Sequence, residues 1–518
     1  MTDSSQPLDT TPVLVGGGQA VLGDLPDLEG EVLHPMDLCA DAARRALDEA
    51  GAKGDLAAAL QSITVVRMFE DSGSRRMHEF GRSSNPPRSV ARRIGADPAE
   101  AVYSSAGGAT PQSRVNQLAE RIARGELEAA LLCGVENIAT VVHAMRNGAE
   151  LDFEEDVEGS LVDEGFGDHW FDKHQLTHRF AQPVHCYPLL EHAIRAERGH
   201  SVEEHLRHMA ELFAPFSEVA AANPYAYRAQ AYSVDDLTEP TGRNRFIGYP
   251  YGRLLNARDR VDQSSAAVLL SVSKARELGV PRENWVFLHG CSDVAENKLL
   301  LERPLYQRSE AARLMGVTAL EMAGLGMDDM ASIDLYSCFP SAVEIVTREL
   351  GLAEDDPRGL TTTGGLPYFG GPGNSYSLHA IAEAVRRARE APGTYHWVSA
   401  NGGNVNKQSA GIYSTEAILG TWERKDPALD QQKIAAQELP PITLEPDGEA
   451  TVETFTVAFD KEELDFGLVV GRQVSDGARF LARVASEETD TLKALLEAGM
   501  DVRGRASTKD EISTFVAS

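Results

Sequence analysis

The sequence predicts an α/β protein made of two similar halves and followed by a small β-rich unit. The first observation is an internal repeat: residues 46–51 read Ala-Leu-Asp-Glu-Ala-Gly, and residues 319–324 read Ala-Leu-Glu-Met-Ala-Gly. Each closes a stretch with the apolar spacing of a helix, and each glycine stands where a helix ends. A short apolar strand follows, at 63–66 and at 333–336. Similarity at such a separation predicts a duplicated fold.

The second observation is that the repeat continues through a glycine-rich turn, a helix and a strand. The corresponding pieces are the turns at 107–111 and 370–374, the helices ending near Arg124 and Arg389, and the strands at 129–134 and 396–400. Matching the two helices without gaps places Gly108 opposite Gly371. The two halves are therefore expected to present equivalent turns.

Alternating strands and helices predict mostly parallel sheets covered by helices, with the loops at the carboxyl ends of the strands gathered where the halves meet. A functional site is expected at that joint. Glycine-rich turns at helix starts bring backbone N–H groups and the positive end of a helix toward a carbonyl or an anion. The plainer interpretation, that these are only tight turns, stays open.

Residues 145–255 interrupt this alternation with acidic, aromatic and histidine-rich sequence, and the apolar spacing around 202–213 predicts one long amphipathic helix. We interpret the stretch as an inserted loop or lid domain. It contains four candidate metal ligands: His169, His174, His178 and His185. Their spacing fits no strict metal-binding motif, so we expect packing or surface histidines and no metal site.

After a linker predicted at 425–441, the chain becomes β-like. Residues 451–459 alternate apolar and polar, two apolar runs flank a turn at 475–477, and a short helix is expected at 489–498. A small barrel of the OB type fits this pattern over 442–518. Acidic residues outnumber basic ones there, which disfavours an oligonucleotide groove.

Composition excludes several classes of protein. The chain has 518 residues, with 79 Asp and Glu against 49 Lys and Arg and a formal charge of −30, so it repels nucleic-acid phosphates and anionic membranes. Five scattered cysteines predict neither a disulfide framework nor a zinc ribbon. No apolar run is long enough to cross a membrane, and residues 1–11 lack a signal-peptide core, so we expect a cytoplasmic protein.

Specific motifs then resemble the thiolase superfamily, in the branch of the sterol-carrier-protein thiolases and their acetyl-CoA acetyltransferase-like relatives. Residues 364–372 look like that family's GG…GHP segment, and residues 334–339 look like its HDCF segment. Residues 223–226 and 265–270 also match. The resemblance covers nearly all of 11–424 and implies a five-layer αβαβα fold of two halves, with the C-terminal unit similar to an OB-like domain found fused to, or partnered with, thiolase-like proteins.

The resemblance and the internal pattern together predict a division of the chain into an α/β duplicated thiolase fold with an insertion and a barrel. Its parts are an N-terminal half at 1–144 and 256–285, the inserted loop domain at 145–255, a C-terminal half at 286–424, the linker at 425–441, and the OB-like barrel at 442–518.

The family's chemistry needs a cysteine at a helix start, a histidine that activates it, oxyanion donors and usually a second cysteine. Here the residue at the nucleophile position is Gly108, and the histidine of GHP is replaced by Gly371. If a gap is allowed, Ser104 or Ser105 falls near the nucleophile position. A serine there needs a base within hydrogen-bond reach.

The remaining site residues follow from the same resemblance. Cys338 matches the cysteine of HDCF, which in that branch does acid/base work, and Tyr336 replaces the first residue of that segment. His379 either projects toward the site or packs in its helix. Candidate contacts to a substrate carbonyl are Asn401, Asn404 and Lys407, and candidate contacts to coenzyme A phosphates are Arg243, Arg245 and Arg253. Cys338 as a small buried residue, the asparagines as turn formers and the arginines as surface ion pairs are the plainer alternatives.

Two functions follow as expectations. One is an acyl-CoA-dependent acyltransferase or carbon–carbon bond lyase of lipid metabolism, acting on a coenzyme A thioester without a bound cofactor and without the usual cysteine. The other is a non-catalytic protein that binds acyl-CoA or a lipid thioester. A hydrolase using Ser105 is a weaker third. The expected partners are the small thioester and either a second copy or another protein docked through the barrel, with no nucleic acid or membrane.

Overall fold

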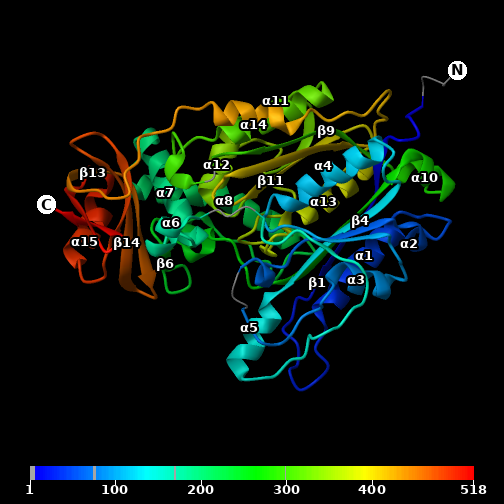
Figure 1. The fold of residues 1–518 in the computed structure, drawn as a ribbon, viewed down its shortest axis with the longest axis horizontal. Coiled ribbons are helices and arrows are strands. Elements are labelled where there is room, and N and C mark those ends of the chain that lie inside the picture. Colours follow the sequence, from blue (N-terminus) through cyan, green and yellow to red (C-terminus); the bar gives the residue numbers. More distant parts are fainter. Residues whose placement is uncertain (1–5, 74–76, 168–170, 298) are drawn as a thin grey trace.

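The computed structural model describes residues 6–73, 77–167, 171–297 and 299–518 (Figure 1). Its main sheet joins the two halves of the repeat. The first half contributes β1 (Pro12–Val21), β2 (Ser62–Val65), β3 (Glu100–Tyr103), β4 (Ala129–Asn137) and β8 (Asp262–Ser271). The second half contributes β9 (Val286–Ala295), β10 (Met330–Asp334), β11 (Tyr395–Gly402) and β12 (Lys407–Ser414). The two sets meet where β1 pairs with β9.

The two halves have the same strand order. In the first half the order is β3-β2-β4-β8-β1, and in the second it is β10-β11-β12-β9. The central strand β4 pairs parallel with β2 and antiparallel with β8, just as β11 pairs parallel with β10 and antiparallel with β12. In place of a counterpart to β3, the Leu335 N–H donates to the carbonyl oxygen of Leu360 at 2.9 Å. The predicted duplication is confirmed by this topology.

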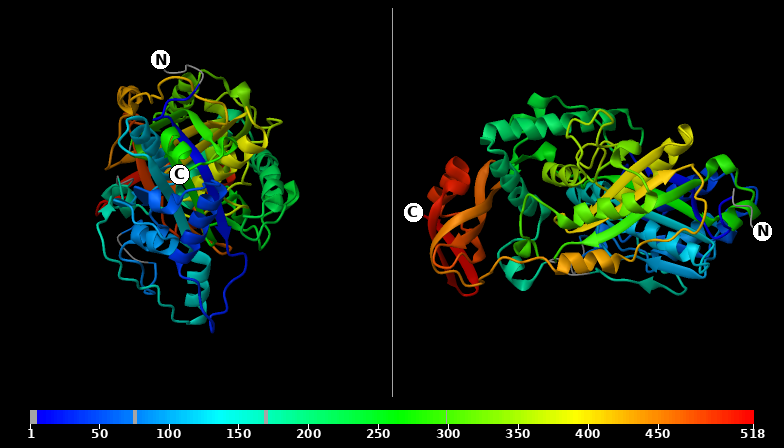
Figure 2. Two further views of the ribbon diagram at one scale, coloured as in Figure 1. Left: turned by 90° about the vertical axis from the view of Figure 1, so that its right-hand side faces the viewer. Right: turned by 90° about the horizontal axis from the view of Figure 1, so that it is seen from above.

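Helices complete five layers. Helices α4 (Thr110–Ala123) and α13 (Tyr376–Glu390) lie between the half-sheets and contact both, and their apolar faces form a shared core. The outer layer of the first half contains α1 (Pro35–Glu49) and α3 (Pro86–Ile94), with the short helices α2 (Leu56–Ala59) and α10 (Val272–Glu277) nearby. The outer layer of the second half contains α11 (Glu310–Ala323) and α12 (Pro340–Glu349). The predicted five-layer α/β architecture is therefore present (Figure 2).

The inserted region is largely helical. Its elements are α5 (Ile138–Asn147), β5 (Val162–Asp163), α6 (Lys173–Thr177), α7 (Pro183–Arg198), α8 (Val202–Ala222), α9 (Val234–Thr238), β6 (Phe246–Gly248) and β7 (Tyr251–Gly252). The amphipathic helix expected around 202–213 is α8, which begins as predicted and continues to Ala222 because its buried face persists to Ala220. Helices α7 and α8 pack against α12 of the second half.

The C-terminal unit is a closed barrel of five strands at one end of the molecule (Figure 1). Its elements are β13 (Gly448–Asp460), β14 (Glu463–Gln473), β15 (Arg479–Val484), α15 (Thr489–Ala498), β16 (Arg503–Lys509) and β17 (Ile512–Ala517). The β13–β14 pairing closes the ring. The short strand β6 of the insert pairs with β13, so the barrel and the insert share one sheet.

The predicted linker is partly wrong, because residues 425–441 contain a helix, α14 (Pro427–Ala435). Asp426 caps its first turn, and Pro427 suits the first helical position. Ile434 is fully buried, and Asp430 accepts a hydrogen bond from Thr318 of α11. The segment therefore packs along the core before it reaches the barrel. Among the described helices, none is long and apolar enough to span a membrane.

Candidate functional site

The two glycine-rich turns meet at the joint between the halves, as predicted. The Gly107 N–H donates to Asn374 Oδ1 at 2.9 Å, and the Ser377 hydroxyl donates to the Gly108 carbonyl oxygen at 3.0 Å. The side-chain amide of Asn374 also donates to the Arg67 carbonyl oxygen at 2.8 Å. Asn374 thus links the loop after β2, the start of α4 and the start of α13. Its role was missed from the sequence, where only the adjoining glycines gave a signal.

Gly108 faces a tyrosine. A Cβ placed on Gly108 would lie 2.4 Å from Tyr336 Oη and 2.5 Å from the carbonyl oxygen of Asn401, both closer than real Cβ contacts. The Tyr336 hydroxyl therefore occupies the space in which a side chain at position 108 would begin. In this arrangement the start of α4 has no room for a nucleophile.

Tyr336 follows β10, and its ring packs edge-on against Tyr376 with centroids 5.3 Å apart. The residue is 8% exposed, and its hydroxyl has no hydrogen-bond partner among the described residues. Burial is the main reason that the pKa of Tyr336 lies well above its ordinary value. The hydroxyl is therefore neutral near pH 7 and is an available hydrogen-bond donor.

Cys338 lies beside Tyr336 in a small polar cluster. Asn401 directs its amide nitrogen toward Cys338 Sγ at 3.8 Å and donates to the Tyr187 hydroxyl at 2.9 Å. The amide oxygen of Asn401 accepts from Gln408 Nε2 at 3.1 Å, and the Tyr187 hydroxyl donates to the Gly403 carbonyl oxygen at 2.5 Å. Burial raises the pKa of Cys338 to about 12, so the thiol stays protonated at neutral pH. Tyr187 and Gln408 carried no spacing signal in the sequence.

His379 packs inside the fold. It is fully buried, its Nδ1 lies 2.8 Å from Gln19 Oε1 of β1, and its ring contacts Phe369 at a centroid distance of 5.1 Å. Burial lowers the pKa of His379 to about 3. Within the described part of the chain its printed contacts reach neither Tyr336 nor Cys338, which corresponds to the packing alternative.

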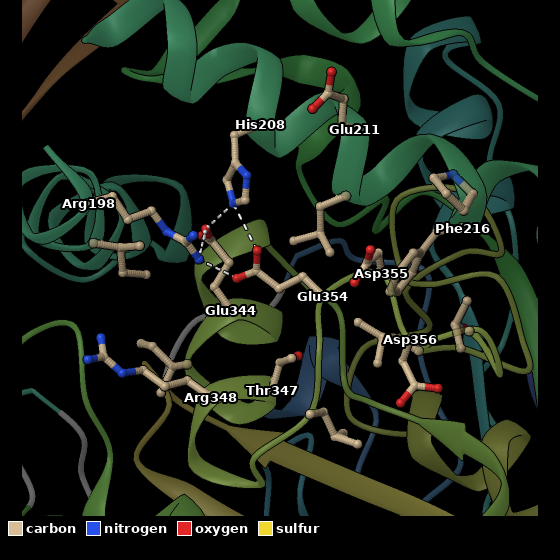
Figure 3. A pocket seen from close by; sticks show the side chains of 18 of the residues that line it. Arg198, His208, Glu211, Phe216, Glu344, Thr347, Arg348, Glu354, Asp355 and Asp356 are labelled. Carbon is tan, nitrogen blue, oxygen red and sulfur yellow. Dashed lines mark hydrogen bonds and ion pairs between the residues drawn. The ribbon is translucent and has the colours of Figure 1, made fainter. Parts of the chain in front are cut away.

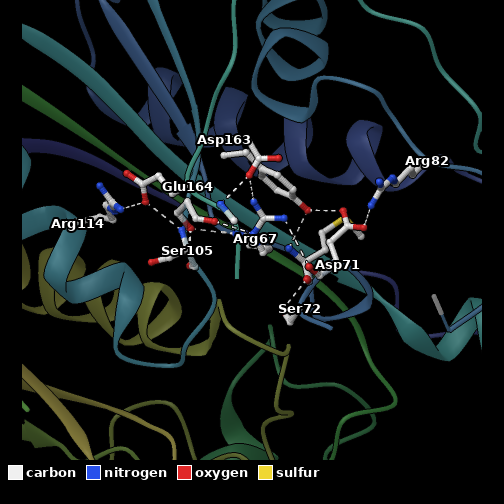
Figure 4. Close-up of polar contacts among 12 residues, drawn as sticks. Arg67, Asp71, Ser72, Arg82, Ser105, Arg114, Asp163 and Glu164 are labelled. Atoms are coloured by element: carbon white, nitrogen blue, oxygen red, sulfur yellow. Dashed lines mark hydrogen bonds and ion pairs between the residues drawn. The ribbon is translucent and has the colours of Figure 1, made fainter. Parts of the chain in front are cut away.

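Gly371 and the serines are also arranged differently from a thiol site. A Cβ on Gly371 would face the Arg258 carbonyl oxygen at 3.3 Å and Leu366 at 3.4 Å, away from Gly108. Ser104 Oγ accepts from the Arg67 N–H at 3.1 Å and donates to the Ser105 carbonyl oxygen at 3.0 Å. The Ser105 hydroxyl has no hydrogen-bonded base among the described residues (Figure 4).

The other predicted contacts lie apart from this cluster. Asn404 is 5% exposed, with its carbonyl oxygen accepting from Arg303 at 3.1 Å, and Lys407 begins β12. Arg243 and Arg253 are exposed on the insert, and Arg245 donates to the Lys461 carbonyl oxygen of the barrel at 3.2 Å. These arginines therefore flank the junction of insert and barrel.

The candidate histidines of the insert contact the barrel. His178 Nε2 accepts from the Ser513 N–H at 2.8 Å, and its ring lies 4.2 Å from that of His174. His185 packs edge-on against Phe466 with centroids 5.0 Å apart. His169 lies outside the described residues. The three described histidines thus serve packing between insert and barrel.

Two clefts adjoin these elements. One, of about 1060 Å³, lies between α8, α12 and residues 351–361 (Figure 3). The other, of about 630 Å³, lies at the carboxyl ends of β2 and β3 beside Arg67 and Tyr103 (Figure 4). Arg67 donates to the Ser104 carbonyl oxygen at 2.9 Å, so the second cleft borders the turn that leads to Gly108.

Comparison with known proteins adds a family. A family model described as the thiolase-like protein type 1 additional C-terminal domain matches residues 430–508. The chain is 38% identical to the crystal structure of a monomeric SCP2-thiolase like protein type 1 from Mycobacterium smegmatis, over 99% of this chain and 100% of that chain, with a TM-score of 0.82.

Two further solved structures share the fold. The Ltp2-ChsH2(DUF35) aldolase is 18% identical over 78% of this chain and 98% of that chain, with a TM-score of 0.58. The acetyl-CoA acetyltransferase from Syntrophomonas wolfei is 16% identical over 78% of this chain and 99% of that chain, with a TM-score of 0.54. No curated protein sequence matches the chain.

Proposed function

The chain belongs to the SCP2-thiolase-like proteins of type 1, and from that premise we propose that it binds an acyl-CoA thioester without forming an acyl-enzyme. The observation that carries this proposal is the contact between Gly108 and Tyr336. An acyl-enzyme needs a thiolate or an activated hydroxyl at the start of α4. Here the space for that side chain is filled by a neutral phenol.

The same phenol supplies a binding contact. The Tyr336 hydroxyl has no partner among the described residues, so it is free to donate a hydrogen bond to a thioester carbonyl. The start of α4 adds the positive end of a helix near that oxygen. A neutral donor and a helix end polarise a carbonyl without forming a bond to it.

The neighbouring groups support binding over turnover. The raised pKa of Cys338 and the lowered pKa of His379 leave both groups neutral at pH 7, and both amide donors of Asn401 are engaged. A general base works best with a pKa near the working pH. Neither of these two groups meets that condition.

For the nucleotide end of coenzyme A we retain Arg243, Arg245 and Arg253 as proposed phosphate contacts, because guanidinium groups pair well with phosphate. The ligand is thus a thioester of lipid metabolism that needs no covalently bound cofactor. A substitution of all three by Ser tests this part separately: it should weaken binding of coenzyme A while leaving that of a pantetheine thioester unchanged. Equal loss for both ligands would place the nucleotide elsewhere.

The main test combines binding and turnover. Coenzyme A, acetyl-CoA, acetoacetyl-CoA and longer acyl-CoAs should raise the melting temperature, since a ligand that binds only the folded form stabilises it. Chromatography of the same samples should show no release of coenzyme A. Tyr336→Phe should bind roughly tenfold more weakly, the loss of about one hydrogen bond. Tyr395→Phe, a partly exposed tyrosine on β11, is the matched control. The absence of any thermal shift contradicts the proposal.

A second candidate is a carbon–carbon bond lyase of the retro-aldol or retro-Claisen kind that forms no acyl-enzyme. The observation that favours it is the same unpartnered Tyr336 hydroxyl beside the Cys338 thiol, because a phenol can stabilise a developing enolate oxygen. This function predicts cleavage products from 3-hydroxyacyl-CoA or 3-ketoacyl-CoA and their loss in Tyr336→Phe. Binding without products leaves the first proposal standing alone.

A further inference from the structure

A second polar cluster lies away from Tyr336, where α7, α8 and α12 pack together. Glu191 of α7, His205 of α8 and Glu344 of α12 are 0%, 1% and 2% exposed. One ligand atom from each lies within 4.8 Å of the others. We propose that these three side chains bind one divalent transition-metal ion.

The first step of the argument is the meeting of two buried carboxylates. Glu344 Oε2 has no hydrogen-bond partner among the described residues, although the side chain is almost fully buried. The neighbouring acidic group is the carboxylate of Glu191. Two buried like charges at such a separation need a shared proton or a cation between them. A cation would satisfy the unpartnered oxygen and both charges at once.

The second step is the way in which the ligands are held. The Tyr251 hydroxyl donates to Glu191 Oε2 at 2.6 Å and lies 2.7 Å from Ser341 Oγ, which leaves Glu191 Oε1 facing His205 Nε2 at 2.6 Å. His205 Nδ1 lies 3.3 Å from His200 Nδ1. With the proton on His205 Nδ1 and donated to His200, the lone pair of Nε2 faces the carboxylates. Metal-binding histidines are commonly fixed by such a hydrogen bond.

The third step separates this cluster from its outer neighbour. His208, Glu344 and Glu354 also converge, with His208 Nε2 at 2.9 Å from Glu344 Oε1 (Figure 3). There the guanidinium of Arg198 already supplies a cation, ion-paired with Glu354 and at 3.4 Å from Glu344. Within the described chain, no Lys or Arg forms an ion pair with Glu191. The inner group is therefore the one in which a metal ion has no competitor.

The donor set indicates the kind of ion. One imidazole nitrogen and two carboxylates suit Zn²⁺, Mn²⁺, Fe²⁺ or Co²⁺, whereas Ca²⁺ and Mg²⁺ prefer oxygen ligands alone. The cleft of about 1060 Å³ is lined by His208, Arg198 and Glu344 and gives a path from solvent to the cluster. The sequence predicted no metal site, because these ligands come from three helices with no motif spacing.

The experiment uses the full chain, freed of metal with a chelator, and Co²⁺ as the probe at pH 8, where ligand protons compete least. We expect one Co²⁺ per chain, with visible absorption bands, and competition by Zn²⁺. Glu344→Gln and His205→Gln should abolish the bands. Tyr251→Phe, which loosens Glu191, should weaken binding by roughly 10- to 100-fold. Glu354→Gln removes a carboxylate of the outer group and should bind as the wild type does.

Circular dichroism and melting curves check that each variant is folded. If Glu344→Gln fails to fold, Tyr251→Phe and Glu354→Gln still separate the inner from the outer group. Two results overturn the proposal. One is the absence of Co²⁺ and Zn²⁺ binding to the wild type, which means that the carboxyl groups share a proton. The other is equal binding to all folded variants, which places the ion elsewhere.

Discussion

Tyr336 Oη lies 2.4 Å from the point at which a Cβ of Gly108 would stand. The two residues come from equivalent regions of the two halves, the turn before α4 and the loop after β10. A glycine at the start of α4 and a tyrosine after β10 are therefore complementary: the absence of one side chain makes room for the other. This contact distinguishes the site from one built around a nucleophile.

Gly108→Cys should destabilise the protein by about 1–3 kcal/mol, because the new side chain meets Tyr336 and the Asn401 carbonyl oxygen in a packed interior. Adding Tyr336→Ala should recover part of that loss but not all of it, since the Asn401 backbone stays in place. Urea unfolding measures both effects. Gly23→Cys, where no atom lies within 4 Å, is the control and should change little. An unchanged unfolding free energy for Gly108→Cys would contradict the packing described.

The cysteines should be unreactive in the folded protein. All five are free and buried, and the pKa of Cys338 is raised to about 12 by burial. Because the thiolate is the reactive species, alkylation at pH 8 should be slow until denaturant is added. Mass spectrometry of trypsin peptides after brief iodoacetamide treatment provides the readout. Rapid and selective labelling of Cys338 would mean that it acts as a nucleophile after all.

The stability of the protein should fall in mild acid, in part through His379. Its pKa is about 3 in the folded protein against an ordinary value of 6.5, so between these pH values the unfolded chain binds a proton that the folded chain excludes. The free energy of unfolding then decreases as pH falls below 6.5, by at most about 1.4 kcal/mol per pH unit from this group. His379→Gln can still hydrogen-bond with Gln19 and should lose less stability between pH 7 and pH 5.

Urea unfolding at the two pH values gives the comparison, with His143→Gln on the partly exposed side of α5 as the control. Equal acid sensitivity of the wild type and His379→Gln would show that His379 is not protonated on unfolding in this range.

The chain should be a monomer. The short strand β5 pairs parallel with the edge strand β3, and ion pairs of Arg67 with Asp163 and of Arg114 with Glu164 hold it there. Covering an edge in this way prevents pairing with another chain. Light scattering should give the mass of one chain, and Asp163→Ala with Glu164→Ala should introduce concentration-dependent association. Glu158→Ala, an exposed residue nearby, should not. A wild-type dimer at micromolar concentration would contradict this prediction.

The barrel should depend on Arg479 for its attachment. This residue is fully buried, donates to the carbonyl oxygens of Leu301 at 2.9 Å and Arg303 at 2.6 Å, and pairs with Glu453 at 3.0 Å. Breaking a buried pair leaves a charge and carbonyl groups unpaired, at a cost of roughly 3–5 kcal/mol. Arg479→Met should therefore expose residues 436–447 to limited proteolysis, whereas Arg505→Met on the exposed side of β16 should not. Equal protease resistance of both variants would exclude this role.

Much of the fold was predictable because it depends on local patterns. The repeat at 46–51 and 319–324, the turns before α4 and α13, and helix α15 follow from apolar spacing and glycine placement, and all appear in the structure. Helix α14 was missed because proline and polar residues at 425–441 are typical of linkers, whereas the helix is stabilised by Ile434 packing on the core.

The site was less predictable because it depends on contacts between distant segments. Gly108, Cys338 and Tyr336 could be placed in one region by their motifs. That the tyrosine hydroxyl fills the space beside Gly108 depends on the packing of two halves, and the part of Asn374 depends on three loops that meet only in the folded chain. No spacing rule contains that information.

Calorimetric titration of the wild type with acetyl-CoA tests the central claim most directly, because heat reports both binding and turnover. The account predicts a saturable isotherm of one ligand per chain, with the signal returning to baseline after each injection and no acyl adduct on the protein afterwards. Absence of binding heat, or a sustained heat signal with an acylated chain, would contradict it.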